Sequence, residues 1–271
     1  MRVFSRTIIA VFCVLAVAPI GWHILSSLKP PSELAIIPPT VLPQQPTLDN
    51  YRELFTRRPF GSYYANSFVI AALSSLLCVA AGALAADALC RARASLRRVI
   101  TASLLVVAFF PPIVLLFPLY EMVRATGLVN HPWGLILPYA ALNLPLSTWL
   151  LTGYFGQIPH ELEEAAAIDG LTRLQTFVKV VLPLSSPALA TTGLLAFIFA
   201  WNEFMFALTF MNLESSKTIT VGVATLSGAF AEEIPWGLLA AGVVASSLPL
   251  ILLVLVFQRK IVAGLTAGAS K

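Results

Sequence analysis

Three of the 13 acidic residues of this sequence lie close together, since Glu161, Glu163 and Glu164 fall within about one helical turn. No Ser, His and Asp grouping suited to hydrolysis accompanies them, so we expect no catalytic residue. The three histidines of the chain are scattered, with neither a carboxylate nor a cysteine at ligand spacing, so we expect no metal ligand. Carboxylates placed so close together can pair with basic side chains.

A second polar group interrupts an apolar segment further along the chain, at Trp201, Asn202 and Glu203. An amide or a carboxylate deep in an apolar helix is costly, so it should face the interior of a helix bundle or a watery cavity. Such residues could line a passage, where a polar group beside an aromatic face suits a sugar. They could equally form an interhelical hydrogen bond, or lie near an outer membrane interface, where Trp is common.

Several other kinds of chemistry have no support in the sequence. No GxxxxGK[ST] pattern and no Gly-rich loop after a strand occurs, so the chain is not expected to bind ATP by that route. No basic run alternates with aromatic residues, so nucleic acid is not expected as a partner. Cys13, Cys78 and Cys90 lie far apart in or beside apolar segments, which predicts small buried side chains and no disulfide framework.

Two short helices with a sharp turn between them are expected to position the first group of carboxylates. Pro159 suits a first helical position, and acidic residues after it are favoured by the helix dipole. Gly170 can end this helix, because glycine takes the left-handed conformation cheaply. Thr172 and Gln175 have the spacing of a capping box, so a second helix should begin there.

The second helix is expected to be amphipathic and short. It should stop near Leu182, because Pro183 disfavours its continuation. Its residues at i, i+3, i+4 and i+7 form one apolar stripe, which consists of Leu174, Phe177, Val178 and Val181.

The composition predicts that lipid surrounds most of the chain. Hydrophobic residues make up 58% of the 271 residues, and only 11% are charged, less than half the share of about 25% in a soluble domain. We therefore expect an all-α membrane protein, a single transmembrane domain over residues 1–271. Six apolar segments are long enough to cross a bilayer, at about residues 7–28, 64–89, 99–120, 133–155, 187–211 and 236–257.

Details of these segments refine the prediction. The first could be a cleaved signal peptide, because Ala16-Val17-Ala18 resembles a cleavage site, but Pro19 follows and the apolar run continues, which favours a span. Small residues between Ala80 and Ala86 would let the second span pack closely against a neighbour. Prolines inside the third span predict a kinked or broken helix.

The basic residues predict which side of the membrane each loop occupies. Six spans put both termini on one side, together with the hairpin at residues 159–183. That side carries eleven basic residues, against six on the other, which predicts that it is cytoplasmic and that the Pro-rich segment from Lys29 to Ser62 lies outside. The eleven are Arg2, Arg6, Arg91, Arg93, Arg97, Arg98, Arg173, Lys179, Arg259, Lys260 and Lys271.

The hairpin also carries a recognisable spacing. Glu164-Ala165-Ala166, three residues, Gly170, nine residues and then Val180-Val181-Leu182-Pro183 resembles the EAA motif of bacterial ABC importer permeases, with Val180 where the family pattern has Ile. Neighbouring residues, and the stretch from Ala200 to Phe204, resemble the carbohydrate-uptake branch. The order of features is similar to the shorter, six-span permease of maltose-type importers, over nearly the whole chain.

The resemblance implies the type I ABC importer permease fold and a set of partners. These are a second homologous permease, a dimer of ATPase subunits that binds ATP and Mg, and an extracytoplasmic sugar-binding protein, all at the plasma (inner) membrane of a bacterium. It implies that the chain itself binds no cofactor and hydrolyses no ATP. The residues expected to couple it to the ATPase are Glu161, Glu164, Ala165, Ala166, Asp169, Gly170, Leu174, Phe177, Leu182 and Pro183.

Alternatives stay open at this point. The hairpin could lie on the membrane surface, although that predicts Lys and Arg on its polar face where acidic residues stand. The solute could be a polyamine or phosphate, or the chain could be a proton-coupled secondary transporter with Glu203 as the coupling carboxylate. Asp87 is expected to pair with Arg91 one turn later. The C-terminal tail is expected to be disordered or to reach toward the ATPase.

Overall fold

The structure, a computed structural model, describes residues 2–226 and 234–267, with side chains from Arg6 to Gln258 except at residue 10 within those ranges. Every regular element in this part of the chain is helical. Four helices are long and apolar enough to cross a membrane, namely α1 (Arg2–Ser27), α4 (Phe60–Arg91), α7 (Trp133–Phe155) and α14 (Trp236–Ala267). They match four of the six predicted spans and confirm the all-α membrane class.

Two bent pairs of helices bring the number of spans to as many as six. In the first, α5 (Ala94–Ala108) is followed by a short 3-10 helix, η1 (Pro112–Leu115), and α6 (Leu116–Ala125), and the path bends by 83°. This is the break expected from the prolines of the segment at 99–120. In the second, the segment Arg173–Leu184 meets α11 (Ser186–Asn202) at 78°.

The fifth predicted span, 187–211, contains a break between two helices that the sequence did not indicate. α11 ends at Asn202, Glu203 is extended, and α12 (Met205–Phe210) begins after it. The Glu203 carboxylate accepts hydrogen bonds from the N–H groups of Phe206 (2.9 Å) and Ala207 (3.1 Å). A side chain that satisfies the first free N–H groups of a helix allows the chain to begin a new helix there.

The sixth predicted span, 236–257, agrees with the apolar segment Trp236–Gln258, but the helix that contains it is longer. α14 continues past residue 257 as far as Ala267, so residues 258–267 are helical and the prediction of a disordered tail was wrong for them; residues 268–271 lie outside the described part. No proline follows Pro249, and Gln, Arg, Lys, Ala and Leu are good helix formers. The residues after Pro249 therefore include no proline that would end the helix before Ala267.

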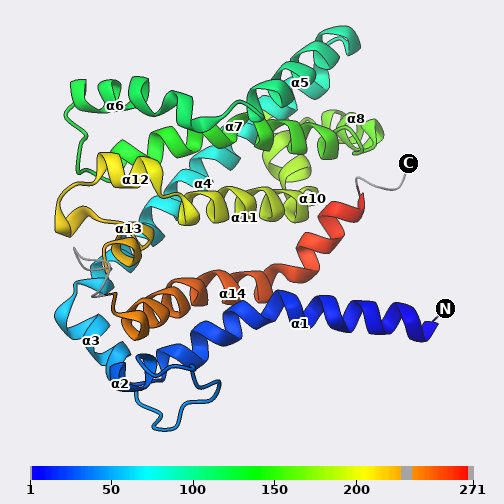
Figure 1. The fold of residues 1–271 in the computed structure, drawn as a ribbon. Coiled ribbons are helices and arrows are strands. Elements are labelled where there is room, and N and C mark those ends of the chain that lie inside the picture. Colours follow the sequence, from blue (N-terminus) through cyan, green and yellow to red (C-terminus); the bar gives the residue numbers. More distant parts are fainter. Residues whose placement is uncertain (1, 227–233, 268–271) are drawn as a thin grey trace.

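The centre of the bundle is α4, which packs chiefly against α7 and α11, while α1 packs against α14 (Figure 1). A Cβ atom at Gly82 would lie 3.5 Å from both Ser147 Cβ and Thr148 N of α7. Backbones come this close only where side chains are small, which confirms the close packing expected from the run Ala80–Ala86.

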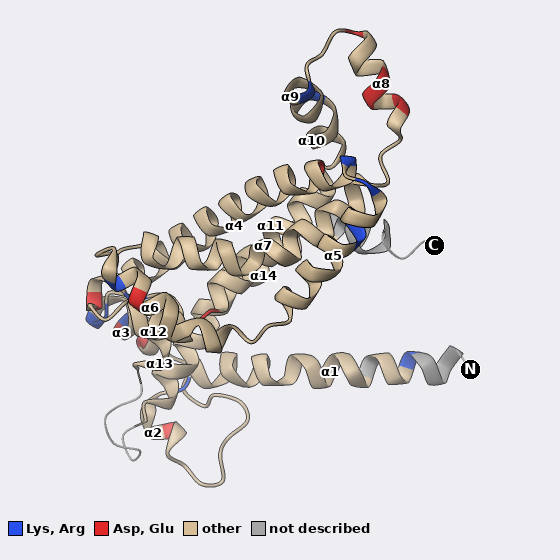
Figure 2. Ribbon diagram, turned by 90° about the horizontal axis from the view of Figure 1, so that it is seen from above, with Lys and Arg blue, Asp and Glu red and all other residues tan. Residues whose placement is uncertain are grey.

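The charged residues lie at the two ends of the long helices, with a largely uncharged region between them (Figure 2). The end of α4, the start of α5 and the hairpin lie at one end, together with the start of α1 and the last turns of α14 (Figures 1 and 2). The shorter elements lie at the opposite end, namely α2 (Pro31–Leu34), α3 (Asp49–Arg57), α12, η3 (Glu214–Ser216) and α13 (Ile219–Ala224). This distribution is the one that a bilayer requires.

Candidate functional site

The hairpin at residues 159–183 projects beyond the ends of the long helices (Figure 2). Its first helix, α8 (His160–Ile168), follows Pro159, which is extended and lies one residue before the helix. Glu161 and Glu163 occupy the first turn of α8, where the helix dipole stabilises negative charge. The expected acidic start of the hairpin is therefore present.

The turn of the hairpin depends on backbone conformations that the sequence indicated. Gly170 has a φ of +79°, in the left-handed region that favours glycine, and no atom lies within 4 Å of the position that a Cβ would take. At the start of α9 (Arg173–Thr176), the N–H of Thr172 donates to Gln175 Oε1 (2.8 Å) and the N–H of Gln175 donates to Thr172 Oγ1 (3.4 Å). The predicted capping box is confirmed.

The second helix of the hairpin does not stop at Leu182. After α9 the chain passes into a π-helix, η2 (Phe177–Val181), and then α10 (Leu182–Leu184), before the bend into α11 at Ser185. Widening the helix to i→i+5 bonds changes which carbonyl faces Pro183, and this accommodates its missing N–H. The expected end of the helix was therefore early by two residues.

The expected apolar stripe is divided between two faces. Phe177 and Val181 are buried in a small core with Phe155 of α7, whose ring meets that of Phe177 edge-on at 6.5 Å. Leu174 and Val178 are instead 67% and 52% exposed. The stripe thus consists of two i, i+4 pairs, of which Phe177 and Val181 face the core and Leu174 and Val178 face outward.

The free surface of the hairpin is both acidic and apolar. Of the predicted coupling residues, one group is buried or packed on the core beneath, namely Ala166, Phe177 and Leu182. The others are exposed, namely Glu161, Glu164, Ala165, Asp169, Gly170, Leu174 and Pro183. Ile168, which the sequence analysis did not select, is 86% exposed at the end of α8. The sequence did contain a hint of this residue. An isoleucine directly before Asp-Gly lies in an otherwise polar turn, where a large apolar side chain is expected only if it packs on another surface.

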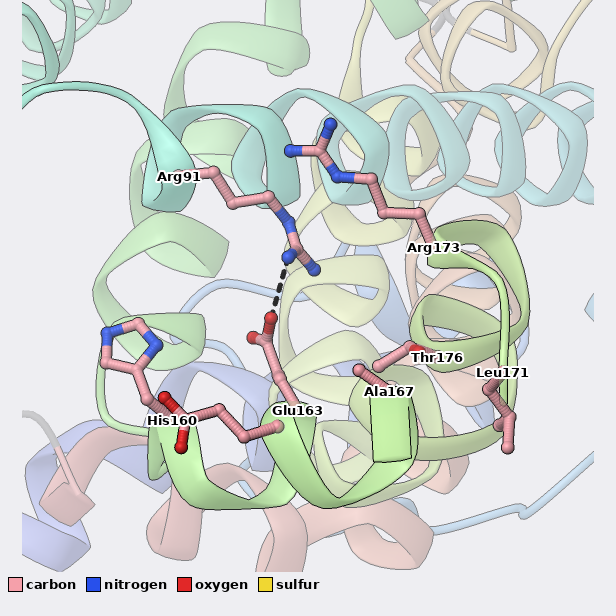
Figure 3. A pocket seen from close by; sticks show the side chains of 8 residues that line it. Arg91, His160, Glu163, Ala167, Leu171, Arg173 and Thr176 are labelled. Carbon is pink, nitrogen blue, oxygen red and sulfur yellow. Dashed lines mark ion pairs between the residues drawn. The ribbon is translucent and has the colours of Figure 1, made fainter. Parts of the chain in front are cut away.

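A three-residue ionic group joins the hairpin to α4. Arg91 makes the expected pair with Asp87, with Nε–Oδ2 and Nη2–Oδ1 distances of 3.1 and 3.0 Å. Its remaining nitrogen, Nη1, lies 2.7 Å from Oε2 of Glu163 on α8. A pocket of about 330 Å³ adjoins this contact and is lined by Arg91, His160, Glu163, Glu164, Ala167, Leu171, Arg173 and Thr176 (Figure 3).

The three predicted pathway residues do not share one role. The Trp201 side chain is buried, stacks on Phe197 with 5.8 Å between ring centroids, and donates from Nε1 to the Ser246 carbonyl at 3.2 Å. The Glu203 carboxylate caps the start of α12 and also accepts a hydrogen bond from the Tyr139 hydroxyl. Of these three residues only Asn202 is exposed, and its amide donates to the Ile198 carbonyl.

The sequence predicted no metal ligand. Within residues 2–226 and 234–267, no group of three or more His, Cys, Asp or Glu side chains is placed so that it could hold one. His23 and His160 lie at opposite ends of the molecule, in the Pro-rich end and the hairpin end.

The helices, their charge-free middle and the projecting hairpin define a multi-pass membrane protein of the transport permease class. Residues 78–266 match the family described as binding-protein-dependent transport system inner membrane component. The chain belongs to this family, whose members are permeases of the inner membrane and not enzymes. A binding-protein-dependent permease is not a proton-coupled secondary transporter, so that alternative is wrong.

Curated relatives cover nearly the whole chain. It is 42% identical to the sulfoquinovosyl glycerol transport system permease protein SmoH of Agrobacterium fabrum, over 93% of this chain and 88% of the relative. It is 41% identical to the trehalose transport system permease protein SugB of Mycobacterium tuberculosis, over 94% and 93%. It is 39% identical to the trehalose/maltose transport system permease protein MalG of Thermococcus litoralis, over 100% and 96%.

A solved structure has the same fold. It is a chain of a bacterial ABC transporter involved in the import of the acidic polysaccharide alginate, with a TM-score of 0.78, 24% sequence identity and 95% coverage of both chains. This agreement supports the type I ABC importer permease fold expected from the sequence.

Proposed function

We propose that this chain is a permease subunit of an ATP-driven ABC importer for a sugar or oligosaccharide, and that the hairpin couples it to a separate ATPase. The observation that carries the proposal is the hairpin itself. It stands clear of the helix bundle, and it presents exposed Ile168 and Leu174 beside exposed Glu164 and Asp169. Apolar anchors rimmed by charge are typical of a surface that docks on another protein.

The acidic character of the hairpin favours a protein partner over the membrane surface. An interfacial helix carries Lys and Arg on its polar face, because these pair with anionic lipid. The exposed residues of α8 include Glu161 and Glu164 instead, which an anionic surface would repel. A basic cleft on an ATPase subunit would attract them.

The orientation and the remaining partners follow from the same proposal. The end that carries the hairpin also carries most of the basic residues of the loops, which supports a cytoplasmic location for it and for both termini. ATP and Mg would be bound by a dimer of ATPase subunits, while this chain holds no cofactor. A second permease subunit and an extracytoplasmic sugar-binding protein would complete the importer, and ATP-driven closure of the ATPase would shift the permeases between two states of access.

Sugar as the solute is supported by the names of the relatives, which are transport systems for trehalose, maltose and sulfoquinovosyl glycerol. Within the chain, Asn202 is the pathway candidate that remains exposed, and we assign it to the lining of the passage. ATP-dependent uptake of a labelled disaccharide by the reconstituted importer tests this choice. Uptake of phosphate or a polyamine, with no sugar transported, would contradict it.

The docking role is tested by reversing one charge. Glu164→Arg should insert in the membrane normally but lose the ATPase subunit during purification and abolish uptake, because like charges then face each other. The matched control is Glu53→Arg, the same change at an exposed site on α3 at the opposite end of the molecule. If Glu164→Arg retains the ATPase as well as Glu53→Arg does, the docking assignment is wrong.

A further inference from the structure

One guanidinium group connects α4 to the hairpin. Arg91 uses Nε and Nη2 in a two-pronged contact with Asp87, one turn earlier on α4, and this fixes the plane of the group. The fixed plane aims Nη1 across to Glu163 Oε2 at 2.7 Å. Figure 3 shows this contact reaching from the end of α4 to the first turn of α8. Asp87 therefore orients Arg91, and Arg91 holds Glu163.

The contact matters because α8 has little other support from the long helices. Ala166 is the only buried residue of α8, and α8 packs chiefly against α9 and η2 of the same hairpin. Between the end of α4 and the hairpin lies the pocket of about 330 Å³, into which Arg173 also points from the far side (Figure 3). The Arg91–Glu163 pair thus spans a gap that no close packing fills.

The pair is also better protected than the exposed ion pairs Arg57–Glu53 and Arg124–Glu121. The side chains of Arg91 and Glu163 are 24% and 25% exposed, whereas those of Arg57 and Glu53 are 76% and 46% exposed. Exposed pairs contribute little because water screens them and their side chains stay mobile. A partly buried ion pair is screened less by water, so it is harder to separate, especially when a second carboxylate holds the guanidinium in place.

We propose that Arg91 is a positioning residue that transmits movement of the coupling helix α8 to the transmembrane helix α4. The chain already ties the hairpin to α7 at one end and to α11 at the other. The pair with Glu163 adds a third connection, to the helix that packs against both of them. A displacement of the hairpin then moves α4, α7 and α11 as a unit. This inference rests on the proposed docking of the hairpin to an ATPase.

The test compares Arg91→Gln, Glu163→Gln and the double variant in the purified importer, reconstituted into vesicles. Uptake and ATP hydrolysis are measured separately. Each single variant should keep its ATPase subunit and hydrolyse ATP, while the amount of solute imported per ATP falls about tenfold. The double variant should be no worse than either single one, because both remove the same contact. Arg91→Lys should recover part of the loss, because lysine restores the positive charge but cannot contact Asp87 and Glu163 at the same time with a planar guanidinium.

The matched control is Arg98→Gln, which removes a positive charge from the first turns of α5, at a side chain that makes no ion pair with any other described side chain. It should import as much solute per ATP as the unaltered importer. Additive losses in the double variant, or normal coupling in Glu163→Gln, would overturn the inference. Should Arg91→Gln fail to assemble, Glu163→Gln decides alone.

Failure of the transmission role and failure of the docking role give different experimental outcomes. If Arg91→Gln loses the ATPase subunit as Glu164→Arg is expected to, Arg91 acts in docking and the transmission role is wrong. If Glu164→Arg keeps its ATPase while Arg91→Gln still lowers import per ATP, the docking site is wrong but the connection to α4 stands.

Discussion

At the scale of single residues, Glu203 shows how a charge in an apolar segment can serve structure. Its carboxylate accepts three hydrogen bonds, from the N–H groups of Phe206 and Ala207 and from the Tyr139 hydroxyl. These contacts hold the break between α11 and α12, and the break leaves Asn202 exposed. Both a structural and a functional role were compatible with the sequence of Trp201, Asn202 and Glu203. The contacts give Trp201 and Glu203 structural roles and leave Asn202 as the candidate for the passage.

Removing the Glu203 carboxylate should therefore lower stability. Glu203→Ala leaves donors without an acceptor, which costs about 1–3 kcal/mol for a buried unsatisfied group. Asn202→Ala is the neighbouring control and should leave the unfolding temperature unchanged while lowering uptake. Thermal unfolding of both variants in detergent, followed by near-ultraviolet circular dichroism, measures the difference. Equal unfolding temperatures for the two variants would contradict the capping role of Glu203.

Gly170 offers a test of backbone conformation in the hairpin. Gly170→Ala should weaken the turn by about 1 kcal/mol, because φ is +79° there, and not through a clash, because nothing lies within 4 Å of the new Cβ. Gly153→Ala on α7 is the matched control, since its Cβ also meets nothing and its φ is not positive. Hydrogen exchange of residues 165–176 should accelerate in the first variant and not in the second.

At the scale of elements, the Pro-rich segment is organised by a buried carboxylate. Glu33 accepts hydrogen bonds from Thr40 Oγ1 (2.6 Å) and from the N–H groups of Gln44 (3.0 Å) and Gln45 (3.4 Å). The hydrogen bond from Thr40, aided by those from the two backbone groups and by the charge of Lys29, lowers the pKa of Glu33 below its ordinary value of 4.5. The loop from Thr40 to Gln45 is thus tied to α2.

This predicts a pH dependence of known sign. Because the pKa of Glu33 is lower in the folded chain, its contribution to stability is complete above the ordinary value and is lost as the pH falls through the folded value. Acidification from about pH 7 to about pH 3 should therefore expose residues 36–47 to proteolysis. Glu33→Gln should be cleaved there at both pH values. Equal protection of the unaltered chain at both would show that Glu33 does not hold the segment.

The contact between α4 and α7 should tolerate only small residues. Gly82→Leu would force its side chain against Ser147 and Thr148 and cost about 1–3 kcal/mol, whereas Gly82→Ala places its Cβ at an ordinary contact distance of 3.5 Å. The yield of folded protein after solubilisation should fall for leucine and stay level for alanine. A normal yield with leucine would mean that the two helices separate readily.

At the scale of the whole molecule, local rules were enough for most of the architecture. Hydropathy located the long helices, and Gly170 with the Thr172–Gln175 capping box located the turn of the hairpin, because each depends on a few neighbouring residues. The break at Glu203 was missed, because a carboxylate in an apolar run does not reveal which donors it will meet.

The candidate site was predicted less completely than the fold. The spacing from Glu164 to Pro183 selected the hairpin, but it did not indicate which of its apolar residues pack on the bundle and which face outward. The pair between Arg91 and Glu163 joins residues far apart in the chain, so only the packing of α4 and the hairpin brings them together. No local pattern carries that information.

The most direct test of the central claim is a cross-link from the tip of the hairpin. In a variant without Cys13, Cys78 and Cys90, Ile168→Cys should react through a short bifunctional reagent with the ATPase subunit of the assembled importer, because Ile168 is 86% exposed at the end of α8. Leu48→Cys, exposed at the opposite end, should give no such product. Cross-linking from residue 48 and none from residue 168 would contradict the assignment of the hairpin as the coupling site.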